Sequence, residues 1–412
     1  MKSISQLQED YCSAQAKHLK LDMSRGKPGA DQLALSDELL DARWVTPARA
    51  ENGFDCRNYG LPGGLPEARR LFADMLEVPE DWVLAGGNAS LNIMFDYLAQ
   101  CMLLGPAGIP WTKAEGTPCD QGKVKFLCPV PGYDRHFGVL ELLGIEMVNI
   151  PMLADGPDMD LAQDLAQDPA VKGLICVPKY SNPEGKTFSD AVVRRFASMQ
   201  TAAEDFRVIW DNAYLVHDLY EESDSLLNVF EAAKEFGTED RFIEVASFSK
   251  ITFPGAGVSC VAASPANLKQ IMKRVSMQTI GPDKLNQLRH ARYFKDAAGI
   301  KAHMKKHAKI LKPKFEAVLE ILQRELPDIA TWTAPRGGYF ISLDLPAGCA
   351  KRTAQLCREA GVVLTPAGAP FPYGRDPEDR NIRIAPTFPP IDELVAATEL
   401  LCVCAQMAAQ GA

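Results

Sequence analysis

The sequence lacks several features that would assign it to particular classes of protein. Its 412 residues contain no run of about 18 uncharged apolar residues, so we expect no membrane-spanning helix. The first ten residues, Met1 to Asp10, have no apolar signal core, and we expect no secretion by that route. Internal repeats and low-complexity linkers are also missing. These absences favour a globular protein without a membrane partner.

Positive charge and histidine are both scarce. The chain has 44 Lys and Arg against 53 Asp and Glu, which gives a net charge of −9, and no zinc-finger or other nucleic-acid signature is present. We therefore expect no nucleic-acid partner. Only His303 and His307, of six histidines, have the helical spacing that a metal could bridge. No third ligand is evident and the intervening Met304-Lys305-Lys306 is typical of a solvated helix face, so we predict no metal site.

Cysteine, in contrast, is plentiful but shows no disulfide pattern. The 11 cysteines are odd in number and scattered, which predicts reduced thiols in a cytoplasm. Cys402 and Cys404 form a Cys-x-Cys pair, but on a helix their side chains would point to different sides.

Both common nucleotide-binding glycine loops are absent. The sequence has neither Gly-x-Gly-x-x-Gly at a strand end nor a Walker loop. It has instead Gly86-Gly87-Asn88-Ala89-Ser90, between a short predicted strand (83–85) and an apolar helical pattern (91–104). A strand, a glycine turn and a helix aim backbone N–H groups at an anion, so a single phosphate fits this loop better than a dinucleotide.

Apolar runs alternate with helical patterns along most of the chain. This order predicts an α/β protein with a mostly parallel sheet and helices on both faces. The length suits a large domain with a smaller α+β domain. We expect residues 51–290 to form the large domain, with 1–50 as an arm and part of the small domain, and 291–412 as the rest of it. The expected strands are 83–85, 124–128, 146–150, 171–177, 208–210, 242–247, 258–262, 339–343, 362–365 and 382–385.

Side chains that could react or bind a ligand recur where the predicted strands end. Tyr133, Asn182, Asp211 and Lys250 follow four different strands. Open α/β sheets bind ligands along the carboxyl edge of their strands, so these four residues are expected to face one crevice.

Lys250 closes the motif Ser247-Phe248-Ser249-Lys250 after an apolar strand. A lysine that is costly to desolvate has a lowered pKa, and its neutral amine can form a Schiff base with an aldehyde. The two serine hydroxyls could hold a phosphate. Taken alone, so short a motif favours a solvated lysine at a strand end. The residues at the other strand ends favour a reactive lysine that forms a Schiff base.

Three further positions are candidates for binding an anionic ligand. Arg383 lies inside the β-branched segment Asn381-Ile382-Arg383-Ile384, and its planar fork suits a carboxylate, although a structural salt bridge is the alternative. The loop Arg25-Gly26-Lys27 is either a solvated entry loop or a flap that meets an anionic ligand. Tyr59, in a turn-rich segment, either packs or presents its hydroxyl to a phosphate.

Together these motifs resemble the fold-type I pyridoxal-phosphate aminotransferases of class I/II over nearly the whole chain. The motifs are Ser181-Asn182-Pro183-Glu184-Gly185, Asp211-Asn212-Ala213-Tyr214, Ser247-Phe248-Ser249-Lys250 and Asn381-Ile382-Arg383. The Ser-Arg-Gly-Lys-Pro segment (24–28) is similar to an aspartate aminotransferase subgroup that is related to the catalytic half of MocR-type regulators. No winged-helix extension is seen, so a regulator is not expected.

The resemblance implies a role for each matching residue. Lys250 would bind pyridoxal 5′-phosphate covalently and shuttle the proton, Asp211 would pair with the pyridine nitrogen, and Asn182 and Tyr214 would hydrogen-bond the 3′-oxygen. Tyr133 would stack on the ring, and Tyr59 would reach the phosphate across a homodimer interface, so that active sites are shared. Arg383 would bind the α-carboxylate and Gly26 would line the substrate pocket. The phosphate would contact Gly87, Asn88, Ala89, Ser90, Ser247 and Ser249.

One position departs from the family pattern. Most members have an arginine eight residues after the lysine that binds the phosphate, and Val258 stands there in this sequence. Hydroxyls, backbone amides or another basic residue would have to compensate.

The favoured activity is amino transfer between aspartate and 2-oxoglutarate. A distal cation is needed for a dicarboxylic substrate, and Arg25 is the first candidate, ahead of Lys27, Lys179 and Arg336. A lyase that acts at Cα or Cβ, or a transaminase for alanine or aromatic amino acids, stays open because the cofactor residues are shared. A non-catalytic amino-acid sensor would not need Lys250 and would require an output domain.

Overall fold

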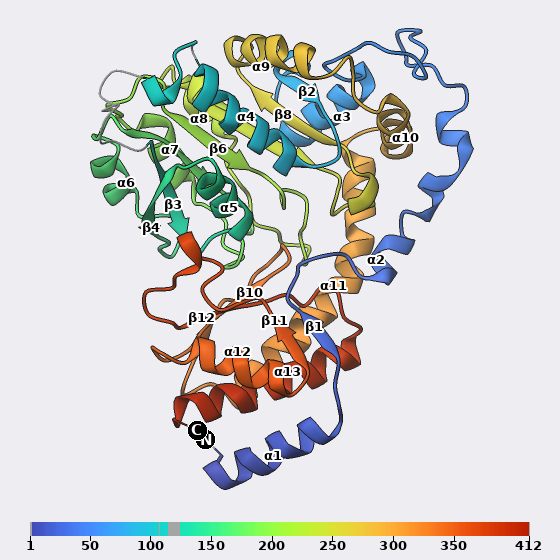
Figure 1. The fold of residues 1–412 in the computed structure, drawn as a ribbon. Helices are drawn as coiled ribbons and strands as arrows, with labels where there is room; N and C mark the ends of the chain where they lie inside the picture. The colour runs from blue at the N-terminus through green and yellow to red at the C-terminus, as the bar shows by residue number, and fades with distance from the viewer. Residues whose placement is uncertain (1, 107, 114–123, 412) are drawn as a thin grey trace.

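The computed structural model describes residues 2–106, 108–113 and 124–411, and its largest element is a seven-stranded sheet (Figure 1). The strand order is β2-β8-β7-β6-β5-β3-β4. Strand β8 runs antiparallel to both of its neighbours, and the other pairs are parallel. The bounds are Val83–Ala85 (β2), Lys125–Val130 (β3), Glu146–Pro151 (β4), Val171–Cys176 (β5), Arg207–Asp211 (β6), Phe242–Ser247 (β7) and Ser259–Ala263 (β8).

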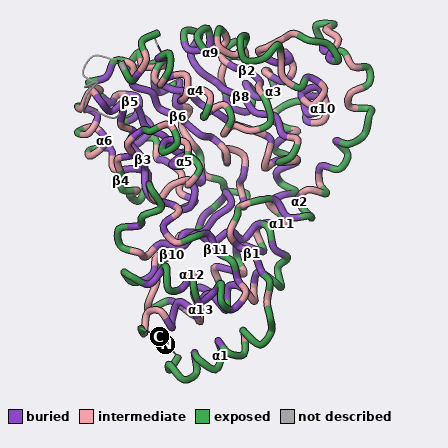
Figure 2. The backbone as a smooth tube through the Cα atoms, viewed as in Figure 1, coloured by how far each residue is buried: buried purple, intermediate pink, exposed green. Residues whose placement is uncertain are grey.

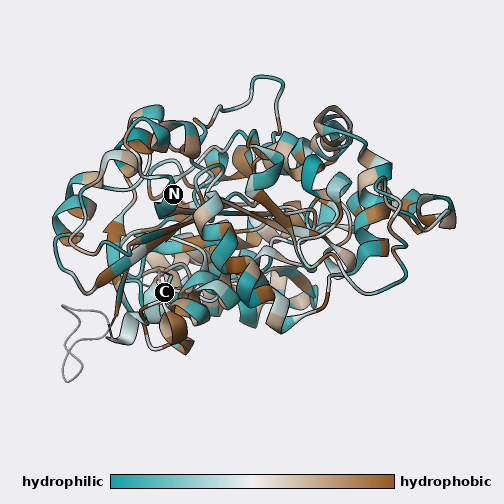
Figure 3. Ribbon diagram, turned by 90° about the horizontal axis from the view of Figure 1, so that it is seen from above, coloured by the Kyte–Doolittle hydropathy of each residue, from teal (hydrophilic) through white to brown (hydrophobic). Residues whose placement is uncertain are grey.

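Helices cover both faces of this sheet because its strands carry apolar residues on both sides. Along β6, Ile209 joins the core under α4, α5 and α9, whereas Val208 and Trp210 join the core under α3, α6, α7 and α8. These helices are α3 (Pro66–Leu76), α4 (Ser90–Leu104), α5 (Asp134–Leu142), α6 (Met159–Leu165), α7 (Asp190–Ser198), α8 (Val229–Lys234) and α9 (Pro265–Gln278). Figure 3 shows the apolar strands between more hydrophilic helices.

The smaller part of the molecule joins the two ends of the chain. Strand β1 (Leu21–Met23) pairs in parallel with β11 (Val362–Leu364). A second small sheet has the order β12-β10-β9 and is antiparallel, with bounds Asn381–Ile384, Ile341–Asp344 and Thr331–Trp332. Helices α1 (Ile4–Ala16), α12 (Ala350–Glu359) and α13 (Ile391–Ala409) pack here, and the chain ends lie together beside α1 and α13 (Figure 1).

Two helices connect the two parts. The helical region between residues 282 and 326 is split at Lys295, whose φ is +69°, into α10 (Lys284–Phe294) and α11 (Ala297–Glu325). Figure 1 shows α11 running from the large sheet down to the small one. A short helix, α2 (Ala30–Ala34), lies beside it. The chain thus places β12, from its C-terminal part, against the carboxyl edge of the large sheet.

The fold class predicted from the sequence is confirmed, including the mostly parallel sheet with helices on both faces. Buried segments follow the strands of the large sheet and α13 (Figure 2). In the described ranges no helix is both long and apolar enough to cross a membrane. Ten of the 11 cysteines are free thiols, and Cys119 lies outside the described residues.

Candidate active site

Four side chains that follow neighbouring strands meet at one edge of the large sheet. Tyr133 follows β3, Asn182 follows β5, Asp211 ends β6, and Lys250 follows β7. These strands are adjacent and parallel, so their carboxyl ends share one edge. The charge of Asp211 acts on both Tyr133 and Lys250, as expected for groups in one crevice.

Asp211 is buried, and only one of its two carboxylate oxygens has a hydrogen-bond partner among the described residues. Its Oδ2 lies 2.9 Å from Nε2 of His136, on α5. Its Oδ1 has no hydrogen-bond partner among the described residues. Leaving a buried acceptor unpaired costs about 1–3 kcal/mol, and a bound N–H donor removes that cost. A protonated pyridine nitrogen is such a donor, so Asp211 fits the ring of pyridoxal phosphate.

Lys250 is half-buried, and its amine lies near an aromatic ring. Its Nζ is 5.0 Å from the ring centre of Tyr214. Burial lowers the pKa of Lys250 below its ordinary value, and the charge of Asp211 opposes this shift. Tyr339 donates a hydrogen bond of 3.2 Å to the Lys250 carbonyl. The lysine is therefore held by its backbone, with a larger neutral fraction than in water.

Two tyrosines line the crevice as neutral phenols. Tyr214 is buried against Tyr339, with ring centres 5.7 Å apart, and Tyr133 meets His136 edge-on at 4.9 Å. Burial raises the pKa of Tyr133 to about 12 and that of Tyr214 well above its ordinary value. Both hydroxyls therefore keep their protons at neutral pH and can donate hydrogen bonds.

The glycine loop is tied to the loop that follows Lys250. Ser249 Oγ donates to the Asn88 carbonyl at 3.0 Å, and the Asn88 side chain accepts from Gly257 N at 2.6 Å. The Gly87 carbonyl accepts from Ser259 N at 2.8 Å. Ala89 is the N-cap of α4 and supplies no side-chain cap. The Asn92 amide donates to the Ala89 carbonyl at 3.1 Å, which leaves the amides before it at the helix N-terminus for an anion.

Val258, at the position where the family pattern has an arginine, packs beside these loops. Val258 is buried, and its carbonyl accepts from Phe248 N at 2.8 Å. The two serines, Ser247 and Ser249, are partly accessible at the end of β7. An anion here would meet hydroxyls and the amide dipoles of the α4 N-terminus.

Arg383 reaches the crevice from the small sheet. It lies in β12 and is 5% exposed. Its NH1 contacts Asp134 Oδ1 at 2.7 Å and Asn182 Oδ1 at 3.2 Å, and its Nε contacts Thr365 Oγ1 at 3.3 Å. The ion pair with Asp134, at the start of α5, links the two parts of the molecule. The structural salt bridge that the sequence left as one alternative for Arg383 is therefore present.

The loop before α2 lies against Phe340, whose ring also faces Arg383. A Cβ on Gly26 would be 2.4 Å from Cζ of Phe340, and the guanidinium of Arg383 lies 4.9 Å from the Phe340 ring centre. Arg25 is exposed and forms no ion pair with any described residue. Lys27 Nζ lies 3.8 Å over the ring of Phe388. Glycine is thus required beside Phe340, and Arg25 stays available for an anion.

Two weaker candidates for the distal cation are already paired. Lys179 Nζ donates to the Leu215 carbonyl at 2.9 Å and contacts Asp218 Oδ1 at 3.1 Å. Arg336 contacts the Glu222 carbonyl through Nε at 3.1 Å. Because each cation has anionic or carbonyl partners of its own, neither is free for a substrate carboxylate.

The solvated face expected at Met304-Lys305-Lys306 is confirmed for the two lysines and wrong for Met304, which is buried. Both histidines are buried in α11, and each Nε2 approaches the Ile251 carbonyl, at 3.1 and 3.0 Å. Gln32 Nε2 lies 3.1 Å from His307 Nδ1 and 3.0 Å from the Tyr339 hydroxyl. Lys305 and Lys306 alone face solvent. The histidines thus support the backbone directly after Lys250.

Tyr59 does not contact the crevice within one chain. Its side chain is 77% exposed, although the neighbouring Gly60 carbonyl accepts from Lys284 Nζ at 3.1 Å. A large aromatic side chain that stands in solvent from a fixed loop is available to a second protein surface.

Sequence reasoning missed several residues of this site: His136, Asp134, Thr365, Phe340 and Tyr339. His136 carried a usable signal, because it follows Tyr133 by three residues and shares its helix face. Asp134 directly follows Tyr133, but nothing in the local sequence indicates its pairing with Arg383. Thr365, Phe340 and Tyr339 come from distant segments, and nothing in their local sequence marks them.

Comparisons with known proteins agree with this geometry. The family model described as aspartate amino-transferase matches residues 2–412. An aspartate aminotransferase of Corynebacterium glutamicum is 46% identical over 407 residues, which cover 98% of this chain and 93% of that protein.

Solved structures show the same fold. The crystal structure of an aspartate transaminase from Corynebacterium glutamicum superposes with a TM-score of 0.93 at 45% identity, covering 99% of this chain and 95% of that one. The α-aminoadipate aminotransferase LysN of Thermus thermophilus, complexed with N-(5′-phosphopyridoxyl)-L-leucine, has a TM-score of 0.78 at 20% identity, covering 98% and 96%. At this lower identity the likeness concerns the fold alone.

Proposed function

Because this chain belongs to the aspartate aminotransferase family, we propose that it transfers an amino group from aspartate to 2-oxoglutarate. The observation that carries the proposal is the unpaired, buried Oδ1 of Asp211 beside the desolvated amine of Lys250. A protein without a nitrogen-containing ring to bind would gain nothing from that unpaired oxygen.

The proposed cofactor is pyridoxal 5′-phosphate, which when bound supplies a ring that accepts the electron pair left at the substrate Cα. Asp211 would keep the ring nitrogen protonated, and Tyr133 would pack on the ring. Asn182 and Tyr214 would hydrogen-bond the 3′-oxygen. The phosphate would be held by the glycine loop, the N-terminus of α4, Ser247 and Ser249.

Lys250 is the proposed covalent anchor and proton carrier. A neutral amine can take the proton from the substrate Cα, and the lowered pKa of Lys250 favours that form at neutral pH. The hydrogen bond from Tyr339 fixes the backbone from which the side chain swings. Restricting the backbone in this way limits the positions that Nζ must search.

Two arginines would determine which substrates bind. Arg383 would bind the α-carboxylate through its planar fork, and Arg25 would bind the distal carboxylate of aspartate or glutamate. A second carboxylate in the crevice without a cation would be strongly disfavoured. The exposed, unpaired Arg25 therefore supports dicarboxylic substrates.

We also propose a cytoplasmic homodimer with shared active sites. The exposed Tyr59 supports this arrangement, since it would complete the phosphate site of the partner subunit. Ten free thiols among the described cysteines support a reducing compartment.

Product analysis tests this proposal. With aspartate and 2-oxoglutarate, the protein loaded with cofactor should form glutamate and oxaloacetate in equal amounts, and Lys250→Ala should abolish both. Fumarate and ammonia, or alanine and carbon dioxide, from aspartate alone would instead identify a lyase. Turnover of alanine or aromatic amino acids in preference to aspartate would remove Arg25 as the distal ligand.

A further inference from the structure

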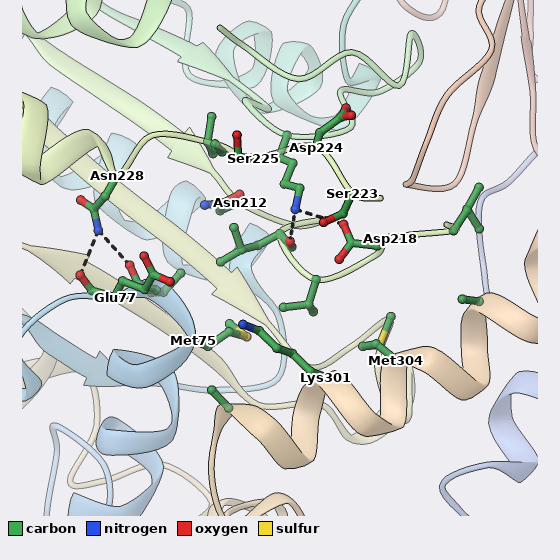
Figure 4. Close-up of a pocket in the computed structure, with 18 of the residues that line it drawn as sticks. Met75, Glu77, Asn212, Asp218, Ser223, Asp224, Ser225, Asn228, Lys301 and Met304 are labelled. Atoms are coloured by element: carbon green, nitrogen blue, oxygen red, sulfur yellow. Dashed lines mark hydrogen bonds and ion pairs between the residues drawn. The ribbon is translucent and has the colours of Figure 1, made fainter. Parts of the chain in front are cut away.

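A large cavity lies apart from the proposed active site. Its volume is about 610 Å³, within the range of about 300–1,000 Å³ that is typical of small-molecule sites. It is bounded by the carboxyl end of β6, the middle of β7, the loop 215–228, the end of α3 and the first half of α11 (Figure 4). No described residue that we assign to the cofactor lines it.

Strand alternation separates the cavity from the catalytic crevice. Asp211 and Asn212 are consecutive, so their side chains leave the sheet on opposite faces. Asp211 points toward His136 of α5, whereas Asn212 points toward Glu244 on the other face. The motif therefore carries one buried polar side chain for each of two sites.

The floor of the cavity presents hydrogen-bond acceptors. Asn212 Nδ2 donates to Glu244 Oε1 at 2.7 Å, and Asn212 Oδ1 has no partner among the described residues. Asn212 is 5% exposed and Glu244 is 4% exposed. Burial raises the pKa of Glu244 to about 7, with the bond from Asn212 opposing the shift. A ligand with N–H donors would satisfy both side chains, and a cation would stabilise the Glu244 carboxylate.

Apolar side chains form much of the wall. Met75, Leu76, Leu215, Leu226 and Met304 line the space between the floor and the opening. Lys179 and Asp218 also line it, but their charges are joined by their 3.1 Å contact. An apolar stem of a ligand fits this middle section.

The opening carries a row of unpaired lysines. Lys301, Lys305 and Lys309 recur every four residues on one face of α11, and all three are exposed. None of them forms an ion pair with a described residue. In Figure 4 the side chain of Lys301 extends toward Met75. Asp74 and Glu77, at the end of α3, also lie at the rim, so an anionic group would be directed to α11.

We propose that this cavity binds a zwitterion of the ω-amino-acid type, with its ammonium group at Glu244 and Asn212 and its carboxylate at the lysines of α11. The apolar chain of the ligand then lies along the methionine and leucine wall. This site is separate from the proposed transamination chemistry and does not depend on it.

The simplest probe is 6-aminohexanoate, which has an amine, five methylene groups and a carboxylate. Calorimetric titration of the cofactor-loaded protein should show binding, whereas hexanoate and hexylamine, which each lack one charge, should bind at least about tenfold more weakly. Equal binding of hexanoate, or no binding of 6-aminohexanoate up to about 10 mM, would overturn the proposal.

Matched variants locate the binding. Lys305→Ser should weaken it about three- to tenfold, while Lys306→Ser, an exposed neighbour that does not line the cavity, should leave it unchanged. Glu244→Gln should remove the preference for the amine. Arg383→Gln should retain binding, because the probe does not occupy the catalytic crevice. Loss in Arg383→Gln with no change in Lys305→Ser would assign the probe to the catalytic crevice and refute the cavity.

Discussion

The ion pair between Asp134 and Arg383 makes a specific prediction about substrate affinity. Asp134 Oδ1 lies 2.7 Å from Arg383 NH1, and the two side chains are 32% and 6% exposed. A substrate α-carboxylate must approach the same guanidinium, which Asp134 already neutralises. Asp134→Asn keeps the shape and the oxygen acceptor but removes the competing charge.

The size of the effect follows from the burial of the pair. Hydrogen bonds to charged groups contribute about 1.5–3 kcal/mol, and the partial exposure of Asp134 reduces this to about 1–2 kcal/mol. Removing the competition should therefore tighten carboxylate binding by roughly 5- to 30-fold. We expect KM for aspartate to fall, with kcat close to that of the wild type.

Succinate gives the cleanest assay, because it carries both carboxylates of the substrate but no amine to react. Its Kd, measured by titration of the cofactor-loaded protein, should fall in Asp134→Asn. Thr365→Val, which removes only the neutral 3.3 Å contact to Arg383 Nε, serves as the control and should change Kd little. Weaker succinate binding in Asp134→Asn would refute the reasoning and show that Asp134 instead holds the arginine in place.

Three further predictions concern the cofactor and stability. Asp211→Asn should lower kcat by about 100- to 1,000-fold with the fold intact, as measured by steady-state kinetics and circular dichroism; unchanged kcat would rule out its pairing with the ring. Tyr59→Phe should weaken cofactor affinity by roughly 10- to 100-fold in a dialysis assay, and no change would argue against a shared site. Burial lowers the pKa of His307 to about 4, so the unfolded chain binds protons first. The free energy of unfolding should therefore fall as pH drops from about 6.5 toward 4; urea titrations at pH 7.5 and 5 with equal midpoints would contradict this.

Many helices and strands could be predicted from the sequence because their positions depend on residues that are neighbours in the chain. The helical pattern predicted at 91–104 matches α4 (Ser90–Leu104) within one residue, and the apolar run predicted at 171–177 matches β5 (Val171–Cys176) within one residue. A glycine turn before a helix and a continuous buried run depend on neighbouring residues only. Strand ends could be located for the same reason, which is why Asp211 and Lys250 were identified.

Side-chain pairing across the fold could not be predicted in this way. Asp134 and Arg383 are far apart in the chain, and nothing near either residue indicates the other. Lys179 seemed free in the sequence, yet the loop after β6 brings Asp218 to it. His303 and His307 lie among lysines, and only the packing of α11 against the Lys250 loop shows that they are buried. These contacts depend on tertiary structure rather than on local pattern.

A single-turnover measurement with aspartate tests the central claim most directly. The cofactor-loaded protein is mixed with excess aspartate without a 2-oxo acid, and both oxaloacetate and the absorption spectrum of the cofactor are recorded. We predict about one oxaloacetate per chain, a spectral change of the same amplitude, and renewed turnover on adding 2-oxoglutarate. The Lys250→Ala protein should show no such burst. Continuous release of fumarate and ammonia or of alanine and carbon dioxide, or a spectrum that does not respond to aspartate, would contradict the account.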